Sequence, residues 1–365
     1  MKELKFISIE KQNDKNVASC CSAVEISAEK PHSISTEWTL SDHWGQIKSR
    51  TSAFRMRYSV PPGLYACGEP DKDSDVLVSA NYKLSFDILR RSLKGLNAWI
   101  LVLDTKGINV WCAAGKGAFG TDELVGRIRK VNLDNIVSHN RLIVPQLGAV
   151  GVNAGAVRRA TRFRVYFGPV CAKDIPAYIS SGYKKTEAMG RIRFSMADRL
   201  VLTPMEINPA MKKYPLYGLI VLLIFGLKPS SIFFRDAWVG GTPFLLLGLI
   251  SVFAGALVTP AMLPFIPFRS FAIKGWITGG LAVFLAVQFF GILDNSTNAI
   301  FLVVSYLFFP LASSYIALQF TGSTTFTGMS GVRKELKFGV PAYIAASGIS
   351  LILMLIFKLG EWGII

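Results

Sequence analysis

The sequence is poor in the residues that most often hold metals. Its 365 residues include three histidines and five cysteines, the latter at positions 20, 21, 67, 112 and 171. No two cysteines are spaced as Cys-x-x-Cys, so the sequence predicts neither a zinc site nor an iron–sulfur run. An odd number of cysteines also fits reduced thiols in a cytoplasm better than a set of disulfides.

Charge is scarce in the last part of the chain. Only eight of the 40 Lys/Arg and four of the 24 Asp/Glu lie between Tyr214 and Ile365, so most of the net charge of +16 is in residues 1–213. Hydrophobic residues make up 51% of the chain, which excludes a disordered protein, a small disulfide scaffold and a simple soluble domain. The first residues, MKELKFISIEKQNDKN, contain no apolar run and do not predict a signal peptide.

Long apolar runs predict a transmembrane domain over residues 211–365, because a spanning helix needs about 20 mostly apolar residues. Lys and Arg are more frequent in the segments on one side of these runs. This distribution places the N-terminal domain in the cytoplasm and the C-terminus on the outer side of an inner membrane. The runs carry almost no ionisable residue at mid-depth, which favours an anchor over an ion pathway. Five spans are expected, at residues 214–232, 242–262, 273–293, 297–319 and 339–358.

The first half predicts an α/β domain over residues 56–210, after an N-terminal region, 1–55, that we expect to be loosely structured. Apolar strands alternate with amphipathic helices, which is typical of a Rossmann-like parallel sheet covered on both faces. Ligands of such sheets lie beyond the carboxyl ends of the strands. We expect strands at 75–82, 98–105, 141–148 and 163–170, an extended segment at 108–112, and helices at 84–93, 121–131 (capped by Thr121) and 174–182.

The segment from Asn109 to Gly117 is the densest motif in the chain, and it has three interpretations. The first is a nucleotide site, because Gly115, Gly117 and Gly120 match Gly-x-Gly-x-x-Gly. That pattern alone is a weak signal, and a P-loop is excluded because a glycine follows Lys116 in place of Ser or Thr. The second is that Cys112 is a small buried hydrophobe, as free cysteines often are.

The third interpretation is a reactive or metal-binding thiolate. Cys112 lies where a strand gives way to a helix, and Lys116 follows four residues later. A helix N-terminus and a nearby lysine both favour the thiolate over the thiol. A thiolate at the carboxyl edge of a sheet is suited to bind a metal or to act as a nucleophile.

The run Asn109-Val-Trp-Cys-Ala-Ala-Gly-Lys116 resembles the signature of the mercury-methylating corrinoid proteins. Four flanking blocks, at 80–90, 103–109, 144–148 and 167–169, resemble the corrinoid domain of the corrinoid iron–sulfur protein of acetyl-CoA synthesis. The resemblance covers about residues 60–206, and a five-span tail also fits the mercury-methylating family.

This resemblance implies a cobalamin or related corrinoid, with Cys112 as the catalytic residue and the lower ligand of its cobalt. No histidine stands in the Asp-x-His-x-x-Gly pattern that supplies imidazole to cobalt in other cobalamin proteins. The residues implied to surround the cofactor come from three loops. They are Asn81 and Thr105; Asn109, Val110, Trp111, Cys112, Ala113, Ala114, Gly115, Lys116 and Gly117; and Pro145, Gln146, Leu147 and Gly148.

The implied activity is that of a corrinoid-dependent methyltransferase, which passes a carbanion-like methyl group from cobalt to Hg(II) and forms methylmercury. A thiolate opposite the methyl group would push electron density onto the metal. The main alternative is a membrane-tethered corrinoid methyl carrier in one-carbon metabolism. An alternative of another class is a membrane transporter with a cytoplasmic nucleotide-binding domain.

The resemblance also implies partners. These are a ferredoxin-like protein with two iron–sulfur clusters, acting as a reductant that can also hand over Hg(II), and a methyl-folate-type donor or its methyltransferase. The basic first half suits attraction to anionic membrane lipid and to an acidic partner. No motif combines aromatic and basic residues, so the charge does not predict a nucleic-acid partner.

Overall fold

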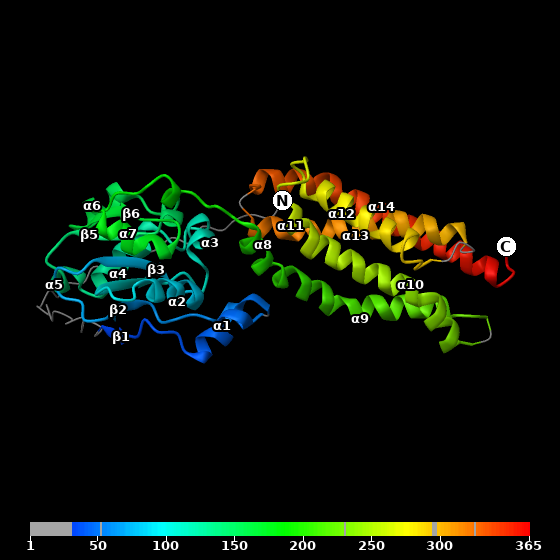
Figure 1. The fold of residues 1–365 in the computed structure, drawn as a ribbon, viewed down its shortest axis with the longest axis horizontal. Coiled ribbons are helices and arrows are strands. Elements are labelled where there is room, and N and C mark those ends of the chain that lie inside the picture. The colour runs from blue at the N-terminus through cyan, green and yellow to red at the C-terminus, as the bar shows by residue number, and fades with distance from the viewer. Residues whose placement is uncertain (1–30, 52, 230, 294–297, 325) are drawn as a thin grey trace, which may run out of the picture.

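The computed structural model describes the whole chain except residues 1–30, 52, 230, 294–297 and 325. Figure 1 shows an α/β unit followed by a long helical bundle, arranged end to end. The C-terminus lies at the end of the bundle that is farther from the α/β unit.

A six-stranded sheet forms the centre of the α/β unit, in the order β1-β2-β4-β3-β5-β6. The pairs β4–β3, β3–β5 and β5–β6 are parallel, whereas β2 is antiparallel to β4. The sheet is therefore parallel-dominated, which corrects the prediction of a wholly parallel one. Two parallel strands need a crossover connection of a dozen or more residues between them. Only a short loop joins β2 to β3, so β2 runs in the opposite direction to β3 and β4. The strands are β1 His32–Ile34, β2 Gly63–Cys67, β3 Val76–Ala80, β4 Ala98–Leu103, β5 Arg141–Val144 and β6 Arg164–Phe167.

Helices cover both faces of the sheet, as the alternating pattern predicted. Val78 and its neighbours on one face pack in a cluster with Leu124 of α4, and Leu77 on the other face packs with Phe86 of α2. Strand order reverses at β3, which has β4 on one side and β5 on the other. The helices of this unit are α2 Lys83–Ser92, α3 Val110–Gly115, α4 Thr121–Lys130, α5 Leu133–Ile136, α6 Ala154–Ala160 and α7 Ile175–Ser180.

Three local expectations require correction. Residues 108–112 are not extended, because Asn109 caps a helix that starts at Val110. Thr121 does not cap α4: Gly120 is the N-cap, and the Thr121 hydroxyl accepts a hydrogen bond from the Asn153 backbone N–H instead. Within the region 1–55, regular structure begins earlier than expected, since the described part forms β1 and helix α1, Leu40–Thr51.

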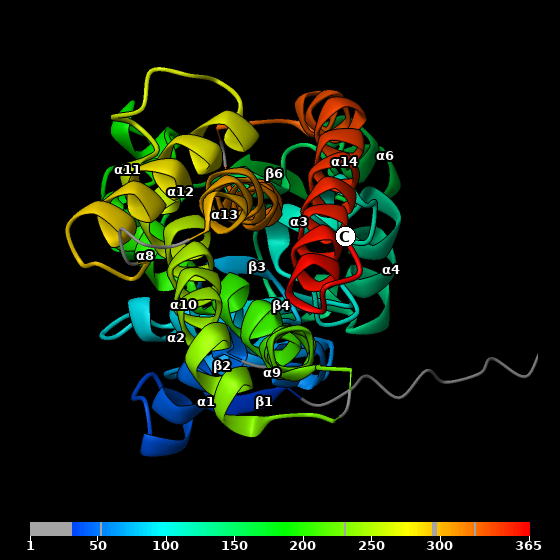
Figure 2. The same cartoon turned by 90° about the vertical axis from the view of Figure 1, so that its right-hand side faces the viewer.

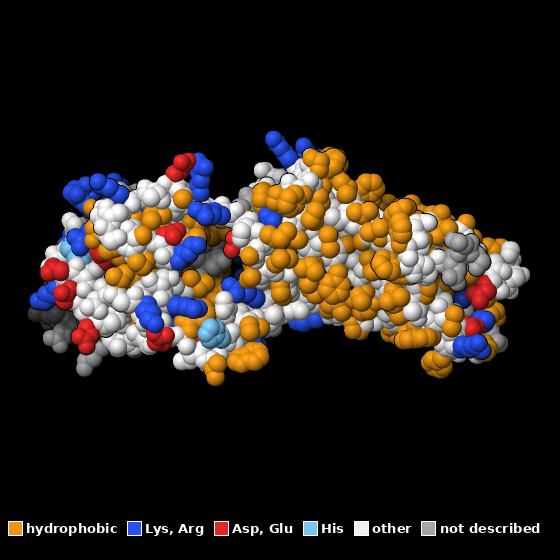
Figure 3. All heavy atoms as spheres, in the orientation of Figure 1, with side chains coloured by type: hydrophobic (Ala, Val, Ile, Leu, Met, Phe, Trp, Pro, Cys, Tyr) orange, Lys and Arg blue, Asp and Glu red, His pale blue; other side chains and the backbone are white. Residues whose placement is uncertain are grey.

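The second unit is a helical bundle whose surface is apolar along most of its length (Figure 3). Four helical segments are long and apolar enough to cross a membrane: Phe234–Met262, Phe271–Gln288, Ala299–Gly322 and Ser330–Glu361. They overlap four of the expected spans. The bundle contains α8 Met196–Leu202, α9 Pro204–Gly226, α10 Phe234–Phe253, α11 Thr259–Met262, α12 Phe271–Gln288, α13 Ala299–Gln319 and α14 Met329–Glu361, with a π-helical turn at Ala254–Val258.

The fifth expected span, 214–232, is not among these four, so the count of five is not confirmed. Helix α9 ends at Gly226, and its first half carries Glu206, Lys212 and Lys213. The apolar part after Lys213 is therefore about 20 Å long, shorter than a bilayer core of about 30 Å. Helix α9 nevertheless lies alongside α10 in the bundle (Figures 1 and 2).

Glycines allow the bundle helices to approach closely. A Cβ on Gly255 would lie 2.5 Å from the Ser313 carbonyl oxygen, and one on Gly248 would lie 2.6 Å from the Tyr217 ring. The two glycines therefore lie where helices pack closely against each other.

A cluster of charged side chains joins α1 to α2. Asp42 pairs with Lys83 and Arg90, each at 2.8 Å, and Asp87 pairs with the same two cations. Burial by itself raises the pKa of Asp42, but hydrogen bonds from Lys83, Thr39 and Arg90 outweigh this effect and hold the pKa below its ordinary value. This cluster therefore fixes α1 against the α/β unit.

Replacing Asp42 by Asn should destabilise the α/β unit by about 2 kcal/mol at neutral pH, because it leaves Lys83 and Arg90 short of a partner. The folded-state pKa of Asp42 lies below the unfolded value of about 3.9, so its contribution is present above that pH and disappears as the pH falls through the folded value. Thermal melting of the full chain in detergent at pH 7 and at about pH 2, which lies below the unfolded value, measures both effects. Glu37→Gln is the control, because the Glu37–Lys94 pair is exposed; equal losses from both variants would contradict the assignment.

Candidate functional site

The carboxyl end of β3 is tied to the loop after β4 by one buried side chain. Asn81 Oδ1 accepts hydrogen bonds from the backbone N–H of Thr105 at 3.1 Å and of Gly107 at 2.9 Å, and it lies 2.8 Å from the Thr105 hydroxyl. Asn81 is 6% exposed and Thr105 is fully buried. Lys106 and Gly107 both have positive φ, at 56° and 71°, so the loop turns back sharply before Asn109.

Helix α3 begins directly after this turn. The Asn109 side chain accepts a hydrogen bond from the Cys112 backbone N–H at 3.0 Å, which stabilises the first turn. Val110, Ala113 and Ala114 are buried against the core. Trp111 is 38% exposed and Cys112 is half-buried, so both lie away from the buried face.

The end of α3 is open to solvent. Lys116 forms the C-cap through its backbone, and its side chain is exposed. Gly117 adopts φ +81°, which ends the helix, and no protein atom lies within 4 Å of a Cβ built on Gly115 or Gly117. These three residues therefore border open space beside Cys112 instead of packing against the core.

The loop after β5 packs tightly against α3. A Cβ on Gly151 would lie 2.2 Å from the Phe119 carbonyl oxygen and 3.2 Å from the Ala114 Cα. A Cβ on Gly148 would lie 2.5 Å from the Phe119 ring. Only glycine permits these approaches, which bring the segment Pro145–Gly148 next to the helix that carries Cys112.

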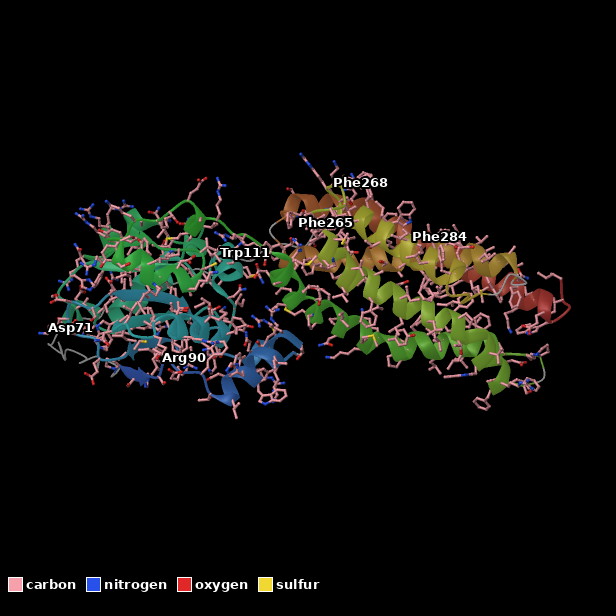
Figure 4. The ribbon with its side chains drawn as sticks, in the orientation of Figure 1. Asp71, Arg90, Trp111, Phe265, Phe268 and Phe284 are labelled. Carbon is pink, nitrogen blue, oxygen red and sulfur yellow. The ribbon has the colours of Figure 1, made fainter. Side chains whose placement is uncertain are left out.

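A recess of about 260 Å³ lies at this edge of the sheet, at the point where strand order reverses. Ligands of open α/β sheets bind at such points. Five of the site residues expected from the sequence line it: Asn109, Val110, Trp111, Pro145 and Leu147. Figure 4 shows Trp111 on the side of the α/β unit that faces the helical bundle.

The other expected site residues lie outside the recess wall. Asn81 and Thr105 hold the loop beneath it, and Ala113 and Ala114 belong to the core. Cys112 lies on the same helix as the wall residues Val110 and Trp111. The remaining expected residues outside the wall are Gly115, Lys116, Gly117, Gln146 and Gly148.

Sequence reasoning missed one side of the recess. Ser85 and Ile88 of α2 line it, and Ile88 is 38% exposed instead of packing in the core as its position on an amphipathic helix suggested. An apolar side chain on the open side of such a helix is the signal that could have identified this wall. Gly168 and Pro169, in the block 167–169 that resembles the corrinoid domain, also line the recess.

The other thiols and imidazoles of the described residues are placed differently from Cys112. Cys67 is fully buried in β2, and burial raises the pKa of its thiol. His139 precedes β5, at the amino edge of the sheet, and its Nε2 lies 2.9 Å from the Ser74 carbonyl oxygen. No group of three or more His, Cys, Asp or Glu that could bind a metal ion occurs in the described part of the chain, and Cys20 and Cys21 lie outside that part.

The family model that matches this chain covers residues of the α/β unit. Residues 53–179 match the family model described as CO dehydrogenase/acetyl-CoA synthase delta subunit. The corrinoid/iron-sulfur protein large subunit of Moorella thermoacetica is 31% identical over 121 residues, which are 33% of this chain and 27% of that protein. The gamma subunit of the acetyl-CoA decarbonylase/synthase complex of Methanopyrus kandleri is 30% identical over 127 residues, 34% of this chain and 27% of that subunit.

The chain thus spans about a quarter of the length of these relatives. Its helical bundle lies outside the residues that the family model matches. The matched residues contain α3, the Asn81 loop and the recess. The predicted likeness to a corrinoid-protein domain is confirmed over this region.

Replacing Gly151 by Ala should destabilise the α/β unit by about 2 kcal/mol or more, because its Cβ would overlap the backbone of Phe119 and push the β5 loop away from α3. Gly115→Ala is the matched control on α3, where a Cβ meets open space. Thermal melting of both variants in detergent measures the difference. A Gly151 variant as stable as the Gly115 variant would show that the loop does not depend on this approach.

Proposed function

We propose that the recess binds a corrinoid, with the Cys112 thiolate as the lower ligand of its cobalt, and that the chain transfers a methyl group to Hg(II). The observation that carries the proposal is the position of Cys112, half-exposed on α3 beside a recess at the carboxyl edge of the sheet. One relative, from Moorella thermoacetica, is by its name a corrinoid protein, and the family model matches the residues that build this edge.

The residues around the mouth of the recess suit one face of such a cofactor. The wall combines Trp111, Pro145 and Leu147, which offer flat or apolar surface to a large ring. Cys112 supplies a soft donor. Histidine ligation has no candidate here, because His139 is at the opposite edge and His32 and His43 belong to β1 and α1.

Each neighbour of Cys112 has a task in this proposal. Asn109 holds the first turn of α3, so the Cys112 sulfur is presented from a fixed helix instead of a flexible loop. Trp111 shields one side of the recess from water. Lys116, exposed at the other end of the helix, can meet a polar side group of the cofactor.

A bound corrinoid would supply a methyl group on cobalt, ready for transfer to an electrophilic acceptor. Cys112 would hold that metal through a soft sulfur donor, which suits release of the methyl group as a carbanion-like group. Such a donor suits transfer to Hg(II), a cation that accepts a carbanion-like group. This is the reason to prefer mercury methylation over simple methyl carriage.

A second function, a membrane-tethered methyl carrier in one-carbon metabolism, is favoured by the names of the relatives, which belong to acetyl-CoA synthase or decarbonylase complexes. Both functions need a methyl donor of the methyl-folate type or its methyltransferase. Both also need a reductant, for which we propose a ferredoxin-like protein with two iron–sulfur clusters. In either case we place the α/β unit in the cytoplasm, tethered to an inner membrane by the bundle.

Methylmercury formation is the deciding measurement. Anaerobic membranes that contain this chain, the ferredoxin-like partner and cobalamin should convert Hg(II) into methylmercury above the level of empty membranes. If cobalt binds stoichiometrically but no methylmercury forms, the methyl-carrier function replaces the mercury one. If no cobalt binds, both functions are wrong.

The variant Cys112→Ala should fold, and its methylmercury yield should fall by roughly 100-fold or more, the effect of removing one charge-stabilising group from a reaction site. The absorption spectrum of bound cobalamin should change as well, because the sulfur ligand is lost. Cys171→Ala is the matched control, since Cys171 is an exposed thiol that lies on the loop after β6 and not on α3. An undiminished yield from the Cys112 variant would contradict the ligand assignment.

A further inference from the structure

A large cavity lies in the bundle. It has a volume of about 980 Å³ and lies between the start of α12, the second half of α13 and the first half of α14. Figure 2 shows α13 between α12 and α14. Helices α12 and α14 contact α13 extensively but make few contacts with each other. The cavity is at the end of the bundle nearer the α/β unit, where both α12 and α14 begin (Figure 1).

One side of this cavity is cationic. Arg269, Lys274 and Lys334 line it, and none of the three has an ion pair among the described residues. Lys274 is 8% exposed, and its ammonium donates to the Leu263 carbonyl oxygen. A buried ammonium whose partner is a neutral carbonyl retains its attraction for an anion.

The carboxylate in the cavity wall does not neutralise these cations. Glu335 Oε2 accepts hydrogen bonds from the Ser270 hydroxyl at 2.9 Å and from the Ala272 backbone N–H at 2.8 Å. It therefore caps the start of α12 and joins that helix to α14. Three cations against one occupied carboxylate leave the cavity with an excess of positive charge.

The other side of the cavity is apolar and opens to the surroundings of the bundle. Phe268, Trp276 and Phe338 line it and are 46%, 52% and 66% exposed. Figure 4 shows Phe268 at the outer surface of the bundle. In a bilayer, side chains at this position face lipid, and an aromatic residue beside cations is typical of the boundary between headgroups and acyl chains.

We propose that this cavity binds one anionic phospholipid of the inner leaflet. Its phosphate lies against Arg269, Lys274 and Lys334, and an acyl chain lies along Trp276 and Phe338. Basic pockets between membrane helices on the cytoplasmic side recognise anionic headgroups in this way. A free phosphate would use only the cationic side and leave the apolar wall unexplained. The bound lipid fills the gap between α12 and α14, so it also stabilises the bundle.

Native mass spectrometry of the full chain in detergent tests the proposal. The chain is titrated with phosphatidylglycerol, with phosphatidylcholine of the same acyl chains, or with glycerol 3-phosphate alone. We expect one phosphatidylglycerol to bind preferentially, and Arg269→Gln with Lys334→Gln to weaken its binding by about tenfold. Both residues are exposed, so the double variant should fold, and its melting temperature in lipid-free detergent checks this.

The matched control is Arg333→Gln with Lys337→Gln, which removes two exposed cations from the same end of the bundle but outside the cavity wall. Unchanged binding by this control supports a built site. Equal weakening by both double variants would show diffuse attraction and overturn the proposal. Equal affinity for phosphatidylcholine, or binding of glycerol 3-phosphate as tight as that of the lipid, would also overturn it.

Discussion

The amide oxygen of Asn81 is the contact on which the candidate site depends. It accepts hydrogen bonds from two backbone N–H groups of the loop after β4 and lies within hydrogen-bond distance of one hydroxyl there. Asn81 itself directly follows the last residue of β3. Two adjacent strands are thereby held in register at the edge where α3 starts. Without this buried acceptor, the N–H groups of Thr105 and Gly107 would be unpaired, at a cost of about 1–3 kcal/mol each. The position of Cys112 therefore follows from an asparagine 31 residues earlier in the chain.

The local pattern of apolar and polar residues predicted much of the α/β unit, because its strands are short apolar runs and its helices show the apolar spacing of amphipathic helices. The strand at Val76–Ala80 and the helices at Lys83–Ser92 and Thr121–Lys130 agree with the sequence to within two residues at most ends. The pattern could not reveal β2, since Gly63–Cys67 has little alternation and is held by its pairing with β4. It also misplaced residues 108–112, where a single cap from Asn109 outweighs the preference of Ile and Val for strands.

The sequence predicts which loops meet at the site, but not which side chains form the wall of the recess. Parallel strands bring their carboxyl ends together, so the sequence alone groups the loops after β3, β4, β5 and β6. Which residues form the wall depends on packing. Asn81 and Thr105 turned inward to bond each other, whereas Ile88 on α2 remained exposed at the recess. Such choices depend on distances between elements that are remote in the sequence, and no local pattern encodes them.

Helix α14 has a consequence for the kind of membrane that suits this protein. With 33 residues it is about 50 Å long, whereas a bilayer core is about 30 Å thick. The helix must therefore tilt, or extend its first turns into the headgroup layer, and the balance between these two depends on bilayer thickness. A thicker bilayer draws more of α14 into the hydrocarbon and straightens it, and a thinner one increases its inclination against α13. Acyl-chain length is thus a variable that acts on the angle between these two helices without any change in the sequence.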